Sequence, residues 1–162
     1  MSSVSLRRLA AWSAGLWSGV MAGIGFIAAP ALFAVLPRAD AGRVVTTLFA
    51  QDAYVGLAFG ALLLILTMQR ARLDAERGMG SRFSTDMILA LVALFCVIAG
   101  HFGVQPMIES ARQGGGGLSF GALHGVSMVF FAGKLAVVSV LAWRLTAEAA
   151  ANRSATAAAT TS

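Results

Sequence analysis

The 162-residue sequence contains few charged residues and only one cysteine. Charged side chains make up 12% of the chain and hydrophobic ones 58%, against about a quarter and about a half in an ordinary soluble domain. A single soluble core does not need so much apolar surface, whereas a bundle in lipid does because its outer faces are also apolar. The lone Cys96 excludes an intramolecular disulfide, and its place within an apolar run indicates packing.

The motifs of soluble enzymes are missing as well. The sequence has no strand-linked glycine-rich phosphate loop, no nucleophile elbow and no HExxH. Its net charge of +5 would suit nucleic acid, but the arginines cluster at the ends of hydrophobic runs, where they set topology and attract anionic headgroups. We therefore expect a protein whose partner is the lipid bilayer, with no enzymatic activity, no cofactor and no nucleic acid bound.

Four apolar runs are each long enough to cross a bilayer. We expect helices at about 9–36, 44–69, 85–104 and 119–144, which together form one domain over residues 1–145. The first run is much longer than the apolar core of a signal peptide, so we interpret it as a retained span. Residues 146–162 are rich in Ala, Thr and Ser and predict a disordered tail. The fold class is an all-α bundle of four transmembrane helices.

The distribution of arginines predicts the orientation. Eight arginines lie at the two termini and in the loop after the second run, and three lie in the other two loops. The positive-inside rule then places both termini in the cytoplasm of a multi-pass protein, and we expect it in a bacterial inner (plasma) membrane. Trp12, Trp17 and Trp143 fall toward the same face, as in an aromatic belt.

Glycine and proline suggest how the helices pack and end. Glycines recur at every fourth position in three stripes, which let helices approach closely in lipid and favour packing within a bundle, a homo-oligomer or a larger membrane complex. The stripes are Gly15, Gly19 and Gly23; Gly56 and Gly60; and Gly117, Gly121 and Gly125. Pro30 should kink the first helix or end its regular hydrogen bonding. The third helix should begin after an N-cap at Ser84 and stop before Pro106.

Ionisable side chains interrupt the apolar runs, where a buried charge is costly unless it finds a partner or water. Counting ~1.5 Å per residue from the helix ends places Asp52, His101 and His124 in the outer third of the membrane. Lys134 is deeper, but helical side chains lean toward the N-terminus, so it leans toward the depth of Asp52. We therefore predict an Asp52–Lys134 pair.

One face of the fourth helix carries most of these groups. The spacing i, i+3, i+7, i+10 puts His124, Ser127, Phe131 and Lys134 on a common stripe that should look into the bundle. The predicted Asp52–Lys134 pair could be a purely structural ion pair or part of a functional site. His124 could equally form a hydrogen bond between helices. His101 could simply be hydrated, because it lies near the membrane–water interface.

These residues lead to three functional hypotheses. The leading one is a polar pocket in the outer half that binds or passes a proton, a small cation or a small polar solute. The alternative is a structural or accessory subunit that packs through its glycine stripes. The third is a haem- or metal-bearing redox subunit: His101, His124 and Asp52 are acceptable ligand types, but they lack the local spacing of a metal motif, so we assign no metal site.

Several short motifs occur together in a fixed order. They are Gly19, Ala29-Pro30-Ala31-Leu32-Phe33, Ala41-Gly42, Leu48-Phe49, Asp52, Pro106-Met107, Arg112 and His124-Gly125-Val126-Ser127. In this order and spacing, the chain from about Trp12 to Trp143 resembles the transmembrane protein 205-like family, small four-helix membrane proteins grouped under a domain of unknown function. The resemblance implies a membrane bundle without an established activity and singles out Pro30, Asp52 and His124. Lys134 is not part of that pattern.

Overall fold

The computed structural model describes residues 2–79, 81–114 and 117–160, with side chains through Glu148. These residues are almost entirely helical and contain no strand. The elements are α1 (Ser3–Ala22), η1 (Gly23–Ala28), α2 (Ala29–Val35), α3 (Arg38–Glu76), α4 (Thr85–Val97), η2 (Ile98–Val104), α5 (Gln105–Arg112) and α6 (Phe120–Thr160). They join into four rods, each long and apolar enough to span a membrane, which confirms the predicted fold class.

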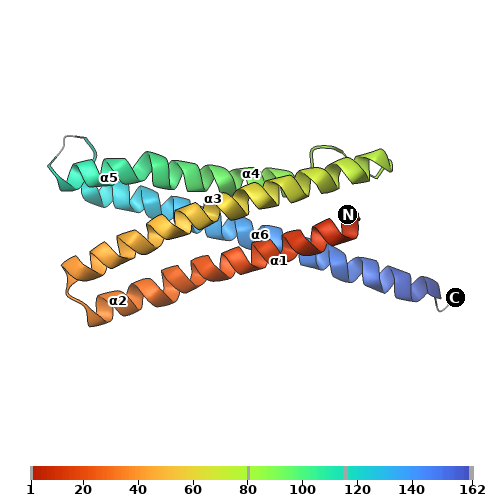
Figure 1. Ribbon diagram of the computed structural model, residues 1–162, viewed down its shortest axis with the longest axis horizontal. Coiled ribbons are helices and arrows are strands. Elements are labelled where there is room, and N and C mark those ends of the chain that lie inside the picture. The colour runs from red at the N-terminus through yellow and green to blue at the C-terminus, as the bar shows by residue number, and fades with distance from the viewer. Residues whose placement is uncertain (1, 80, 115–116, 161–162) are drawn as a thin grey trace.

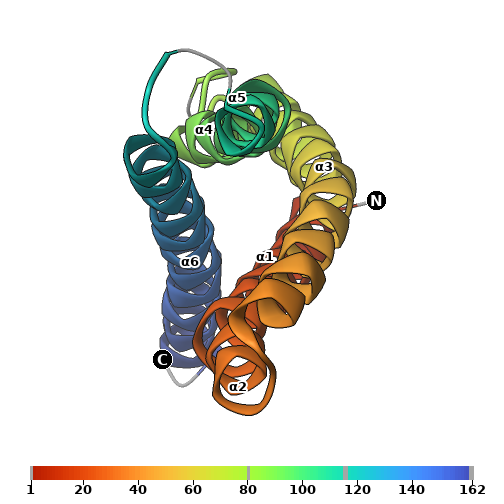
Figure 2. The same cartoon turned by 90° about the vertical axis from the view of Figure 1, so that its left-hand side faces the viewer.

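The four rods form a ring around a shared core (Figures 1 and 2). In this ring α1 packs against α3 and α6, and α4 packs against the same two helices, so α3 and α6 lie diagonally opposite. The core runs along the half of the bundle that contains the N-terminus and includes the fully buried Trp17, Leu63 and Leu141. Toward the other end α2 packs against α3, and the beginning of α6 lies beside α5 instead (Figure 2).

The rods extend beyond the apolar runs because helix ends are set by caps as well as by hydropathy. The second rod begins at Arg38, directly after Pro37, and continues to Glu76, whereas we predicted residues 44–69. The N-cap at Ser84 is confirmed, since its hydroxyl accepts a hydrogen bond from the Met87 N–H. The tail predicted to be disordered is helical through Thr160, consistent with the high helix propensity of its alanines; residues 161–162 of that tail lie outside the described residues.

Two segments of π-helix each precede a proline. η1 ends at Ala28, two residues before Pro30, and η2 ends at Val104, two residues before Pro106. Ala29 N–H donates to Ile24 O, a bond of the i→i−5 type that widens the helix just before the proline. Both prolines then occupy the first turn of a new α-helix, where a missing N–H is tolerated. The regular α-helical hydrogen bonding breaks near Pro30, as predicted. The third rod, however, continues past Pro106 to Arg112, so the prediction that this helix stops before Pro106 is wrong.

Only one of the glycine stripes brings helices of this chain close together. An added Cβ at Gly60 would lie 2.9 Å from Leu94 Cδ1, and one at Gly56 would lie 3.1 Å from Val97 Cγ2, so α3 and α4 touch there. The prediction of packing inside the bundle is wrong at the other positions, because an added Cβ would meet no atom within 4 Å. These positions are Gly15, Gly19, Gly23, Gly117, Gly121 and Gly125.

A cluster of charged side chains fastens the bundle at the N-terminal end. The buried carboxylate of Asp86 on α4 accepts hydrogen bonds from Arg70 Nη1 at 3.1 Å and from Arg144 Nε at 2.9 Å. Arg70 also pairs with Asp74 and Glu148. Since charge-assisted hydrogen bonds stabilise more than neutral ones, this cluster ties α3, α4 and α6 together.

Candidate functional site

Asp52 on α3 and Lys134 on α6 form a buried ion pair in the middle of the ring. Lys134 Nζ donates to Asp52 Oδ2 over 2.6 Å, and the two residues are 5% and 2% exposed. Because α3 and α6 are diagonal to one another, the pair crosses the bundle interior. The predicted contact between these two residues is therefore present.

One carboxylate oxygen of the Asp52–Lys134 pair makes no hydrogen bond within the described residues. Asp52 Oδ1 is buried and has no hydrogen-bond partner in the described part of the chain. An unpaired buried acceptor costs about 1–3 kcal/mol, and replacing a buried ion pair with apolar side chains is often neutral or stabilising. Stability alone thus gives little reason to keep a carboxylate and an ammonium here, which makes the pair the candidate site.

Phe131 covers the pair on the side toward α2. Lys134 Nζ lies 5.3 Å from the centroid of the Phe131 ring, within the range of a cation–π contact. The Phe49 ring meets Phe131 edge-on at 5.1 Å, and an added Cβ at Gly25 would lie 2.9 Å from Phe131 Cε1. Phe131 therefore bridges α6, α3 and η1, and it separates the pair from the end of the bundle where no residue of η1 or α2 is buried.

The other predicted pocket residues do not join the pair. His124 is exposed and stacks on Phe120 at 5.9 Å, so the expectation that it faces the interior is wrong. The reason is that the beginning of α6 packs on η2 and α5 through the buried Leu123, while α2 packs against α3. Ser127, one turn before Phe131, is half-buried.

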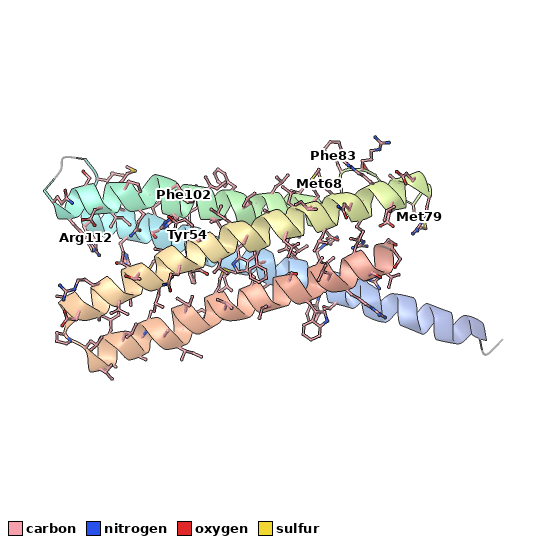
Figure 3. The ribbon with its side chains drawn as sticks, viewed as in Figure 1. Tyr54, Met68, Met79, Phe83, Phe102 and Arg112 are labelled. Carbon is pink, nitrogen blue, oxygen red and sulfur yellow. The ribbon has the colours of Figure 1, made fainter. Side chains whose placement is uncertain are left out.

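His101 also lies outside the pair, although it is half-buried. Its ring lies 5.8 Å from the ring of Tyr54 and 4.9 Å from the ring of Phe102. Tyr54 and Phe102 lie side by side on α3 and η2 (Figure 3), and both are largely exposed. His101 is thus part of an aromatic group on the outside of the bundle.

Trp17 is the site residue that the sequence did not reveal. It was assigned to an interfacial belt, but its side chain is completely buried, whereas Trp12 is 80% and Trp143 is 75% exposed. The indole stacks on Phe59 of α3 and lies against Gly56, one helical turn from Asp52. Its Nε1 has no hydrogen-bond partner among the described residues. The available signal was its spacing from Ala10 and Ala14, small residues on the same inward stripe of α1.

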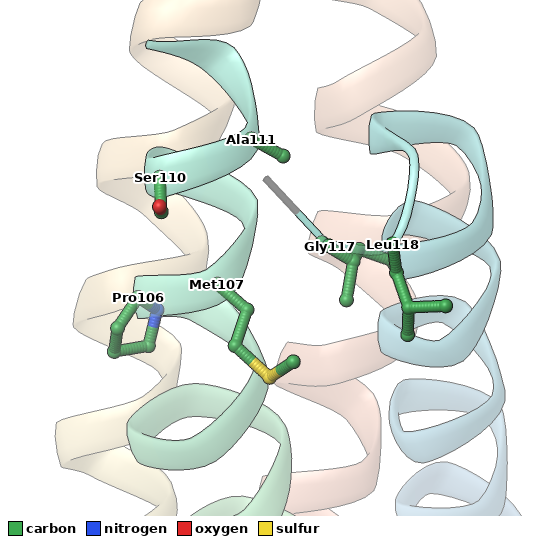
Figure 4. Close-up of a pocket in the computed structure, with 7 residues that line it drawn as sticks. Pro106, Met107, Ser110, Ala111, Gly117 and Leu118 are labelled. Carbon is green, nitrogen blue, oxygen red and sulfur yellow. The ribbon is translucent and has the colours of Figure 1, made fainter. Parts of the chain in front are cut away.

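Within residues 2–79, 81–114 and 117–160, no three His, Cys, Asp or Glu side chains come together in a way that could hold a metal ion. A shallow pocket of about 270 Å³ lies where α5 meets the start of α6 (Figure 4). No charged side chain lines it; its lining residues are Pro106, Met107, Ser110, Ala111, Gly117, Leu118 and Leu123.

Comparison with known proteins places the matched region over three of the rods. Residues 12–116 match the model of the family described as a domain of unknown function, DUF4149. The matched region contains Trp17 and Asp52 and ends before α6, which carries Lys134. No curated protein and no solved structure matches the chain.

Proposed function

The chain belongs to the DUF4149 family, a domain of unknown function, and we propose that it is a membrane protein that binds or passes a proton or a small polar solute at Asp52 and Lys134. One observation supports this proposal: a buried ion pair on the bundle diagonal whose carboxylate has a free oxygen. Ionisable groups at membrane depth are rare and commonly mark ion, proton or solute paths.

The charge balance narrows the class of ligand. Lys134 already neutralises Asp52 through a 2.6 Å hydrogen bond, so a metal cation at the free oxygen would lie beside the ammonium and be repelled by it. A proton can instead add to the free oxygen, and a neutral polar solute can bind there without separating the pair. We therefore favour a proton or a neutral solute over a metal cation.

The path of access is also part of the proposal. The ligand arrives from the α2 end of the bundle, where the helices diverge, and passes Phe131 to reach Lys134. The half-buried Ser127 lies one turn before Phe131 on this route, whereas the exposed His124 lies outside it. The arginine distribution supports an arrangement in which both termini lie on the cytoplasmic side of the membrane, which makes the α2 end the outer one. The membrane that we propose is a bacterial inner membrane.

Proteoliposomes test the proposal directly. Purified protein is reconstituted with an internal pH dye, and the response to an imposed pH gradient is measured with and without small neutral solutes. We expect Asp52→Asn and Lys134→Met to abolish the response, and Asp40→Asn to retain it. Asp40 is the matched control because it is a carboxylate on the same helix that pairs with Arg43 at the surface. Equal responses in all three variants would reject the proposal.

A second candidate function is an accessory membrane subunit. Gly15, Gly19 and Gly23 face away from the bundle, and an added Cβ at each would meet nothing within 4 Å, which leaves this stripe open to another helix. On this hypothesis Gly19→Leu disrupts association in detergent, as measured by native mass spectrometry, while Asp52→Asn leaves association unchanged. Within the family, we also propose that the chain is related to the transmembrane protein 205-like proteins, on the resemblance at residues 29–33 and 124–127.

A further inference from the structure

We infer that Trp17 Nε1 and Asp52 Oδ1 together bind one small neutral molecule that both donates and accepts a hydrogen bond, of the class of water or a short alcohol. The inference rests on the proposed function, because it takes the ion pair to be a binding centre. It adds a residue on a third helix and a chemical requirement for the ligand.

The first step is that both atoms lack partners. Trp17 is 0% exposed and Asp52 is 2% exposed. Trp17 Nε1, a donor, and Asp52 Oδ1, an acceptor, are both buried and unpaired within the described chain. Buried polar groups in proteins are nearly always paired with protein or with ordered water. Two orphaned atoms of opposite character, one on α1 and one on α3, indicate a common partner.

The second step is their proximity. An added Cβ at Gly56 would lie 3.6 Å from Trp17 Nε1, and Gly56 follows Asp52 by one helical turn on the same buried face of α3. The four residues from Asp52 to Gly56 rise about 6 Å. A hydroxyl oxygen that makes two hydrogen bonds of about 2.8 Å at a near-tetrahedral angle joins two atoms about 4.6 Å apart. Because Asp52 and the contact of Trp17 with Gly56 lie on one buried face of α3 within about one turn, one such molecule can reach both atoms.

The third step is the chemistry of the ligand. The indole N–H only donates and the carboxylate only accepts, so the bound molecule accepts from Trp17 and donates to Asp52. A hydroxyl group does both. A halide or other anion fails at the carboxylate, and a metal cation fails at the indole N–H. Since Lys134 holds the other carboxylate oxygen, the site is neutral overall and suits an uncharged molecule.

NMR of ¹⁵N-labelled protein in detergent micelles tests this subsite. Three indole N–H signals are expected, from Trp12, Trp17 and Trp143, and Trp17→Phe and Trp12→Phe assign them. We expect the Trp17 indole proton to show magnetisation transfer from bound water although the side chain is buried, and methanol to shift this signal selectively. Asp52→Leu, which removes the acceptor, should abolish both effects. A Trp17 signal that receives no magnetisation from water and does not respond to methanol would overturn the inference.

The flux assay separates this inference from the function on which it rests. We expect Trp17→Phe to raise the solute concentration at half-maximal response roughly tenfold, the effect of one lost hydrogen bond of about 1.4 kcal/mol. Trp12→Phe, on the exposed face of the same helix, should leave it unchanged. An unchanged half-maximal concentration in Trp17→Phe, with Asp52→Asn still inactive, would overturn the role of Trp17 and leave the proposed function standing. Full activity in Asp52→Asn, with a hydrated Trp17 signal, would overturn the proposed function and leave the subsite standing.

Discussion

The coupling between Asp52 and Lys134 can be measured with a double-mutant cycle. Asp52→Asn removes the charge from a carboxylate whose side chain is 1% exposed and leaves an ammonium whose side chain is 7% exposed. Breaking a buried pair on one side costs about 3–5 kcal/mol because the other charge stays uncompensated. The Phe131 ring, 5.3 Å from Lys134 Nζ, contacts the ammonium before and after the substitution, so its cation–π energy cancels in the difference. We therefore expect Asp52→Asn to lower the free energy of unfolding by about 3–5 kcal/mol.

Lys134→Met should cost a similar amount, since it leaves the Asp52 carboxylate unpaired. The double variant removes both charges, so it should be less destabilised than the sum of the two single variants by roughly 2–4 kcal/mol. Unfolding is followed by far-UV circular dichroism as SDS is titrated into dodecylmaltoside micelles. Asp40→Asn is the control and should change stability by less than about 0.5 kcal/mol, because its pair with Arg43 is exposed. If the losses in the two single variants simply add in the double variant, the two side chains do not interact as described.

Three further predictions concern the rest of the bundle. Asp86→Ala leaves Arg70 and Arg144 without their shared carboxylate. We expect the free energy of unfolding to fall by about 2–3 kcal/mol in the same SDS titration. A loss no larger than that of Asp40→Asn would contradict the role of this charged cluster in holding the helices together. Gly60→Leu forces a side chain against Leu94 and should cost about 1–3 kcal/mol, whereas Gly19→Leu should leave unfolding unchanged; equal effects would contradict the packing of α3 on α4. In a Cys96→Ser background, Ser81→Cys should react with a membrane-impermeant maleimide only from the cytoplasmic side, and Ser110→Cys only from the opposite side; the reverse pattern would invert the topology.

The four spans were predictable because a lipid-facing helix must be apolar over a fixed length, and that requirement is local in the sequence. The contact between Asp52 and Lys134 was predictable for a related reason: depth along a helix and the lean of its side chains follow from residue counting alone. Helix ends were less predictable, since the second rod begins and ends at the exposed, charged Arg38 and Glu76, and hydropathy gives no signal for the end of a helix among charged residues.

The surroundings of the pair depend on packing, which the sequence encodes only indirectly. His124 shares a helical stripe with Lys134, but the stripe faces a neighbour only where one exists, and α2 lies beside α3 instead. Trp17 was interpreted as an interfacial residue because tryptophan is common there, whereas Gly56 provides the space that admits its indole into the core. The glycines of α1 were expected to face another helix of the bundle, but they face outward. The spacing of a stripe does not say which neighbour it faces.

The wide turns before Pro30 and Pro106 make the two rods that contain them tolerant of a change in residue number. A turn closed by i→i−5 bonds takes up one residue more than an α turn, so each rod carries a spare residue ahead of its proline. Deleting one residue from 23–28 would remove the spare residue and allow an unbroken α ladder up to Ala29, and the residues after it would keep their present faces. Phe33 would then stay at the surface. The same deletion from a regular α turn would rotate everything after it by about 100° around the helix axis.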